Sequence, residues 1–103
     1  MYLSNISANE TLSLDYNAFI VDASGNNIVL TLPDVSGGAH GLYFAISRID
    51  ASTNNVTIVP VTGSLLNGLT AGNLSSSQLS THENVGLVVF GSDWYTLHGK
   101  WVS

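Results

Sequence analysis

Two near-identical hexapeptides hold the side chains of this chain that are best suited to bind a cation. Residues 22–27 read DASGNN and residues 50–55 read DASTNN. Oxygen-bearing side chains at alternate positions resemble the start of an EF-hand loop, which also needs Gly at position six and a bidentate Glu at position twelve. Position six is Asn in both copies, and position twelve is Pro33 or Val61. Because both copies fail at the same two positions, we predict no metal site and no cofactor.

The same hexapeptides suit a structural role. Asp, Ser and Asn side chains bond nearby backbone groups in turns, and Gly and Asn tolerate positive φ. Each copy follows an apolar, strand-like segment and precedes a β-branched one that ends near proline, IVLTLP or VTIVP. The sequence therefore predicts one connection used twice, with Asp22 and Asp50 shaping backbone turns and the flanking segments forming two similar hairpins.

The other titratable side chains form no catalytic pattern. His40, His82 and His98 lie in separate segments without metal-ligand spacing, although three copies of one histidine could meet on an oligomer axis and bind zinc or nickel. No Gly-x-Ser-x-Gly elbow is present. A glycosidase needs two carboxylates flanking a cleft, whereas the carboxylates here fall mostly at expected turns. We therefore expect no enzyme activity.

Aromatic side chains are the best candidates for contact with a partner or ligand. Trp94 and Tyr95 are adjacent on an expected strand, so they point to opposite faces and one of them belongs to the core. The predicted contact residues are Tyr2, Tyr43, Tyr95 and Trp101. Such residues stack on sugars and also anchor protein interfaces. For a chain with few charges we favour the interface, with Trp101 anchored on a neighbouring subunit.

Alternation of apolar and polar residues with period two predicts an all-β chain. The alternating segments are residues 12–16, 28–32, 42–46 and 56–60, followed by a hairpin at 85–97. No segment shows a sustained helical period. Short strands separated by turn residues are typical of a small antiparallel β-sandwich or jelly-roll-like barrel. We predict an N-terminal arm at residues 1–12 and a single β-sandwich domain at residues 13–103.

The composition restricts the possible partners. Charged residues make up 9% of the chain, against roughly 25% in average globular proteins. Arg48 and Lys100 are the only Lys or Arg residues, and the net charge is −5. Without a basic patch, nucleic acid and anionic membranes are not expected as partners. A subunit that is largely covered by its own copies needs few surface charges, which favours a homo-oligomer.

Three segments occur in a defined order: FIVDASGNNIVLTLP, then GLYFAISRIDASTNNVTIVP, then LVVFGSDWYTL. This order resembles a β-module of tailed-bacteriophage virion proteins, in which the second segment reads I-x-K/R-x-D-x-S-x-N-x-V-T-I-x-P and the last is a DGS-x-WY hairpin. Here the last turn reads GSDW, a small departure, and the match covers residues 19–97. The resemblance implies an all-β, usually homotrimeric and non-enzymatic virion module, and it makes Trp94 the core residue. It transfers no catalytic site.

These observations predict a non-enzymatic protein of the virion surface, a homotrimeric capsid-decorating or spike protein that binds capsid or tail components. The short chain, with its own methionine and no fibre shaft, favours decoration, with the arm at residues 1–12 reaching the shell or a neighbour. The alternative is the receptor-binding tip of a tail fibre that recognises host surface polysaccharide. An unrelated carbohydrate-binding module is a weaker third hypothesis.

Overall fold

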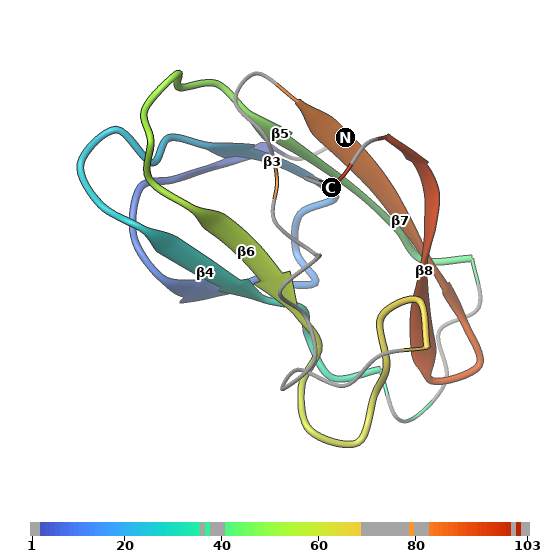
Figure 1. The fold of residues 1–103 in the computed structure, drawn as a ribbon. Coiled ribbons are helices and arrows are strands. Elements are labelled where there is room, and N and C mark those ends of the chain that lie inside the picture. Colours follow the sequence, from blue (N-terminus) through green and yellow to red (C-terminus); the bar gives the residue numbers. More distant parts are fainter. Residues whose placement is uncertain are drawn as a thin grey trace.

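The computed structural model describes residues 3–35, 37, 41–68, 79, 83–99 and 101. This part of the chain forms two β-sheets that face each other (Figure 1). The first sheet contains β1 (Leu3–Ile6), β3 (Ala18–Val21), β5 (Tyr43–Arg48), β7 (Asn84–Phe90) and β8 (Asp93–Gly99), in that order. The second contains β2 (Glu10–Thr11), β4 (Ile28–Thr31) and β6 (Val56–Val59). The prediction of an all-β fold with two sheets is confirmed.

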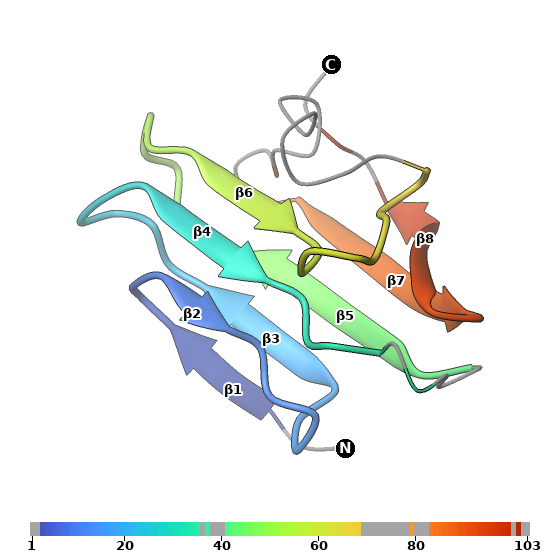
Figure 2. The ribbon, with the colours of Figure 1, turned by 90° about the horizontal axis from the view of Figure 1, so that it is seen from below.

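The chain alternates between the sheets as it coils. β1 is followed by β2 in the opposite sheet, β3 by β4, and β5 by β6, so that each pair forms one turn of a short coil (Figure 2). Successive turns stack in parallel, with Val21 opposite Arg48 in one sheet and Leu30 opposite Ile58 in the other. β7 and β8 then pair antiparallel and extend only the five-stranded sheet.

The predicted antiparallel arrangement is wrong for the three turns of the coil. The segments that flank each hexapeptide do not form hairpins, because they belong to different sheets and pair with their counterparts in the neighbouring turn. Period-two alternation shows which side chains face inward and is the same for either pairing direction. The 28-residue spacing of the hexapeptides does indicate the pairing direction. Repeats of roughly 20–50 residues are typical of folds that stack equivalent units.

The segment predicted as an N-terminal arm belongs to the coil. β1 pairs in parallel with β3, and β2 pairs in parallel with β4. Ile6 and Leu12 are buried in the core. The described part of residues 1–12 is therefore the first turn, and its few apolar residues explain why the sequence did not indicate strands there.

Residues 12–16, predicted as a strand, contain a turn. The Asp15 N–H donates to Ser13 Oγ at 3.1 Å, and the Tyr16 N–H donates to the Ser13 carbonyl at 3.4 Å. Leu14 and Tyr16 are exposed. Local bonds from a serine side chain compete with sheet pairing, and here they override the alternating pattern.

The core lies between the sheets and contains a row of three aromatic rings. The centroids of Phe19 and Phe44 are 4.8 Å apart, and those of Phe44 and Trp94 are 5.1 Å apart. Trp94 is fully buried, whereas Tyr95 is 41% exposed. This confirms that the two residues point to opposite faces and that Trp94 is the core residue. Burying each large apolar side chain contributes about 1.5–3 kcal/mol, so this row links β3, β5 and β8 firmly.

The predicted C-terminal hairpin is confirmed. It contains a shift in register and, at its end, a position that only glycine can occupy. The β7–β8 register shifts between Gly86 and Leu87. Gly99 has a φ of +108°, and a Cβ placed there would lie 2.3 Å from the Asn84 carbonyl oxygen. Because backbone atoms give little way, only glycine fits at this end of the hairpin.

We expect Gly99→Ala to lower the free energy of unfolding by about 3 kcal/mol, since it combines a strained φ with a backbone clash. Chemical denaturation measures the loss. Gly25→Ala is the control, because its Cβ would meet no atom within 4 Å and its φ is not positive. Equal losses in the two variants would contradict the fit at Gly99.

Candidate functional site

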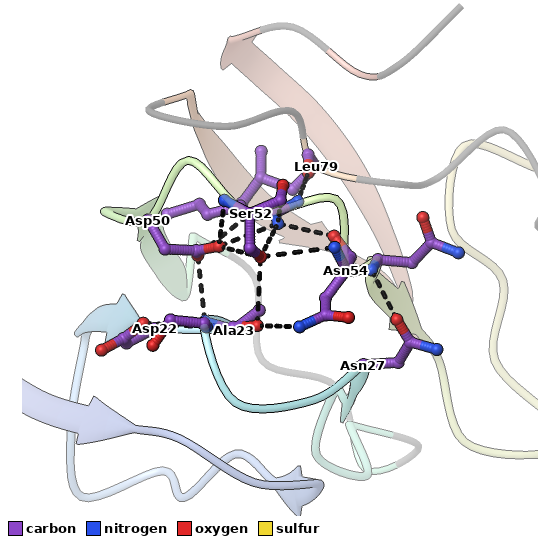
Figure 3. A network of polar contacts seen from close by, with 10 residues as sticks. Asp22, Ala23, Asn27, Asp50, Ser52, Asn54 and Leu79 are labelled. Atoms are coloured by element: carbon purple, nitrogen blue, oxygen red, sulfur yellow. Dashed lines mark hydrogen bonds and ion pairs between the residues drawn. The ribbon is translucent and has the colours of Figure 1, made fainter.

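The two hexapeptides stack on each other (Figure 3). Residues 22–27 join β3 to β4, and residues 49–55 join β5 to β6. The Asn55 N–H donates to Asn27 Oδ1 at 2.8 Å, and the Ile28 N–H donates to the Asn55 carbonyl at 2.8 Å. The repeated sequence is therefore a repeated contact between neighbouring turns of the coil.

Both aspartates shape the backbone in the same way. Asp22 Oδ1 accepts the Ser24 N–H at 3.0 Å, and Asp50 Oδ2 accepts the Ser52 N–H at 3.1 Å. This is the Asx-type turn in which a carboxylate bonds the backbone two residues later. The prediction that Asp22 and Asp50 shape backbone turns is confirmed.

The two connections nevertheless differ in length by one residue, and as a result the two aspartates have different surroundings. The first spans residues 22–27 and the second residues 49–55. Asp22 follows its strand directly and is half-buried, whereas Asp50 comes one residue further from its strand and is buried. Successive side chains of an extended chain face opposite sides. Figure 3 accordingly shows the Asp22 carboxylate pointing away from the polar cluster around Asp50.

Arg48 is the centre of this cluster. Its side chain forms a bidentate ion pair with Asp50, with Nε–Oδ1 and Nη2–Oδ2 distances of 3.0 Å each. Nη1 donates to the Leu79 carbonyl at 2.9 Å, and Nη2 donates to the Asn54 carbonyl. Arg48 is 4% exposed and Asp50 is 9% exposed. Paired with a carboxylate and hydrogen-bonded at all three of its nitrogens, the guanidinium meets the conditions under which a buried charge is tolerated.

The Asp50 carboxylate is equally well bonded. Besides Arg48, it accepts the Ala23 N–H at 2.9 Å and the Ser52 hydroxyl at 2.5 Å. The Arg48 guanidinium is the largest cause that holds the pKa of Asp50 far below its usual range, while burial acts in the opposite direction. The Ser52 hydroxyl and the N–H groups of Ala23 and Ser52 lower this pKa further. Asp50 therefore remains a carboxylate at neutral pH and cannot serve as a general acid.

The cluster joins the second connection to the first through Ala23. The Ala23 N–H bonds Asp50, and the Ala23 carbonyl accepts the Asn54 side-chain amide at 2.6 Å. The side chains of Arg48, Asp50, Ser52 and Asn54 reach the same side of the second connection, as their bonds to one another and to Ala23 show. These are the polar positions of the I-x-K/R-x-D-x-S-x-N pattern. In this protein the pattern is a device that holds one turn of the coil on another.

The structure gives no support to a metal at these aspartates. Within the described part of the chain, no three His, Cys, Asp or Glu side chains lie close enough together to hold an ion. His98 faces Tyr43, with 2.5 Å between Nε2 and the tyrosine hydroxyl. His40 and His82 lie outside the described residues.

The outer face of the five-stranded sheet brings together two of the predicted contact residues. Tyr43 lies opposite Val88, and Val88 lies opposite Tyr95. The Tyr43–His98 pair crosses directly above Gly86, where a Cβ would lie 2.3 Å from His98 Nε2 and 2.6 Å from the tyrosine hydroxyl. Glycine at this position makes room for the pair.

Two shallow grooves lie on this face. The first has a volume of about 200 Å³ and is lined by Ala18, Ile20, Ala45 and His98, among others. Ala18 and Ala45 are register partners, so two small side chains lie next to each other there. The second, of about 280 Å³, is lined by Ile20 and Ile49 among others. Ile20 thus borders both grooves.

Trp101 and Tyr2 differ from these residues. Trp101 is half-buried, packs against the core of its own chain, and donates from Nε1 to Thr96 Oγ1 at 3.0 Å. It also forms an isolated antiparallel bridge with Leu79. Trp101 is therefore held against its own chain, and its contact with a neighbouring subunit stays a prediction. Tyr2 lies outside the described residues.

Sequence reasoning missed the role of Arg48. The available signal was its place in an inward-facing row, because Phe44, Ile46 and Arg48 alternate along β5. A basic residue at the end of an apolar row, in a chain with so few cations, requires a buried partner. Asp50, two residues later, has the right charge and spacing.

Comparison of the chain with protein families, with curated proteins and with solved structures gives no match. Among the described residues, no helix is long and apolar enough to cross a membrane.

The two aspartates allow a matched comparison. We expect Asp50→Asn to lower the free energy of unfolding by about 3–5 kcal/mol, because it leaves the Arg48 guanidinium buried without its counter-ion. In Asp22→Asn the amide oxygen can still accept the Ser24 N–H, so the expected loss is below about 0.5 kcal/mol. Chemical denaturation at neutral pH gives both values. Similar losses would contradict the unequal roles of the two copies.

Acid should weaken the fold through Asp50. Its pKa in the folded state lies below the unfolded value of about 3.9, so its stabilisation is complete above that value and is lost as the pH falls toward the folded pKa. Below about pH 3 this group lowers the free energy of unfolding by about 1.4 kcal/mol per pH unit. The difference in stability between wild type and Asp50→Asn should therefore shrink on acidification. A difference that is independent of pH would contradict this assignment.

Proposed function

We propose that this chain is a non-enzymatic surface protein of a bacteriophage virion, which assembles as a homotrimer and works by binding as a capsid-decorating or spike protein. The observation that carries the proposal is the polar cluster of Arg48, Asp50, Ser52 and Asn54, whose side chains bond one another and reach the backbone of Ala23 in the neighbouring turn. The polar residues behind the resemblance to the virion module thus have a structural role, which suits a module that acts through its surface.

The distribution of exposed apolar residues supports action by binding. Several large apolar side chains on or beside the strands of the five-stranded sheet are exposed: Leu3, Ile49, Phe90, Tyr95 and Leu97. Within the described residues the only Lys or Arg side chain is Arg48, and it is buried in the ion pair. The accessible surface of this part therefore combines apolar side chains with carboxylates and polar neutral groups. Exposed apolar patches of this kind mark interaction sites.

The homotrimer predicts a mass of about three chains of 10.8 kDa in light scattering at micromolar concentration. A monomer under these conditions would contradict the proposed assembly. Decoration predicts that the protein binds assembled capsids of its phage and does not bind host cells.

The alternative proposal is the receptor-binding tip of a tail fibre. It is favoured by the row of Tyr43, Val88 and Tyr95 on one open face, since exposed tyrosine rings stack on sugars. Binding to host cells or to a glycan array, abolished by Tyr95→Ala, would select this alternative over decoration.

A further inference from the structure

We propose that the groove beside Asp22, on the outer face of the five-stranded sheet, receives a lysine side chain of a partner protein. The groove has a volume of about 280 Å³ and lies where β1, β3 and β5 end side by side. That the partner is a protein comes from the proposed function, on which this choice rests. We call the site the Asp22 groove, and it is lined by Asn5, Ile6, Ser7, Ile20, Asp22 and Ile49.

Asp22 lies in this groove because the strand pairing continues past the strand ends. The Asp22 N–H donates to the Ile6 carbonyl at 2.9 Å, and the Ile49 N–H donates to the Val21 carbonyl at 3.0 Å. Since side chains alternate, Asp22 faces the same side as Ile20 and the opposite side to the buried Val21. Figure 3 shows its carboxylate turned away from the buried polar cluster. Asp22 is the one charged residue among those that line the groove.

The distribution of charge favours a cationic occupant. The net charge of the chain is −5. Within the described residues Arg48 is the only Lys or Arg, and its guanidinium is buried against Asp50, so it does not neutralise Asp22. The Asp22 carboxylate is half-buried next to apolar side chains, where a charge is less well solvated than in open water. A cation brought by a partner compensates this charge, and the negative field of the whole chain attracts a basic partner.

The apolar walls of the groove suit the hydrocarbon stem of lysine. Ile20 lines one part of the groove, and Ile49, which is 50% exposed, lines another. A lysine side chain lays its methylene groups along apolar surface while its charged end stays at a polar position. The carboxylate of Asp22 supplies that position. An anionic ligand would instead be repelled by it.

The polar groups of the groove suit an ammonium better than a guanidinium. Asp22 Oδ1 already accepts the Ser24 N–H at 3.0 Å, which fixes the carboxylate before any partner arrives. A guanidinium binds most strongly when its planar fork faces both carboxylate oxygens, whereas an ammonium is a compact charge with three donors. The exposed Asn5 and Ser7 carry further side-chain oxygens that line the groove and can accept the remaining donors.

The direct test is an NMR titration with Nα-acetyl-lysine methylamide. The control probe is the norleucine analogue, whose side chain keeps the hydrocarbon stem without the ammonium. The lysine probe should cause saturable shifts of the Asp22 and Ser24 amides and of the Ile49 methyl groups, and added salt should weaken its binding. The norleucine analogue should bind much more weakly.

Two pairs of variants separate the groove from general effects. Asp22→Asn keeps an oxygen for the Ser24 N–H and should weaken binding of the lysine probe roughly tenfold, because a charge-assisted hydrogen bond is lost. Glu10→Gln removes the same charge from an exposed position on β2 and should bind like the wild type. Ile49→Ser should also weaken binding, whereas Val29→Ser, at a 41% exposed position of β4, should not.

The possible results distinguish the groove from the proposed function. Absence of a saturable shift at Asp22, or equal binding of the lysine probe by wild type and Asp22→Asn, would overturn the lysine site and leave the proposed function standing. Capsid or tail particles that bind wild type and Asp22→Asn equally would overturn a partner's lysine as the occupant. A wild type that binds the lysine probe but neither kind of particle would overturn the proposed function and, with it, the protein partner.

Discussion

One buried ion pair fixes how the second and third turns of this coil lie on each other. Arg48 and Asp50 are two residues apart, and their bidentate contact reaches across to the backbone of Ala23 in the turn before. Removing two charges from water is unfavourable, and a buried pair is tolerated only when its remaining donors and acceptors are satisfied. Here Leu79 and Asn54 satisfy the guanidinium, and Ser52 and Ala23 satisfy the carboxylate.

The pair also reinforces the register of β5, which ends with the inward-facing Arg48 followed by the exposed Ile49. A slip by one residue would bury Ile49, but it would turn Phe44, Ile46 and Arg48 toward solvent. That slip would also remove the Asp50 carboxylate from the Ala23 N–H. The polar cluster therefore contributes specificity of stacking as well as stability, and it explains why the two hexapeptides share a sequence but differ in burial.

Much of the architecture was readable from the sequence, because burial leaves a direct trace in the residue pattern. The alternation in β5 and the final hairpin correctly predicted strands, and the adjacency of Trp94 and Tyr95 correctly predicted opposite faces. Pairing direction was not readable from alternation, since parallel and antiparallel strands bury side chains with the same period. The first turn escaped notice because it buries only Ile6 and Leu12, and the extra residue in the second connection became visible only through the register.

The polar cluster and the exposed sheet face therefore have separate roles in this molecule. Arg48 and Asp50, the charged residues best suited to chemistry, are buried in an ion pair inside the coil. The outer face of the five-stranded sheet retains exposed apolar and aromatic side chains. Sites of contact on a stable β-scaffold are expected where the scaffold itself leaves surface unused. The repeated hexapeptides, whose residue types suggest a binding site, therefore have a structural role.

The most direct test of the stacked coil is amide hydrogen exchange at two adjacent residues. The Ala23 N–H is bonded to the buried Asp50 of the next turn at 2.9 Å, whereas the Ser24 N–H is bonded at 3.0 Å to Asp22 within its own exposed turn. An amide held by a buried cross-turn contact exchanges only on large-scale unfolding, and one held in a surface turn exchanges by local opening. The Ala23 amide is therefore expected to be strongly protected and the Ser24 amide weakly protected. Equal and weak protection of both amides would contradict the stacked coil.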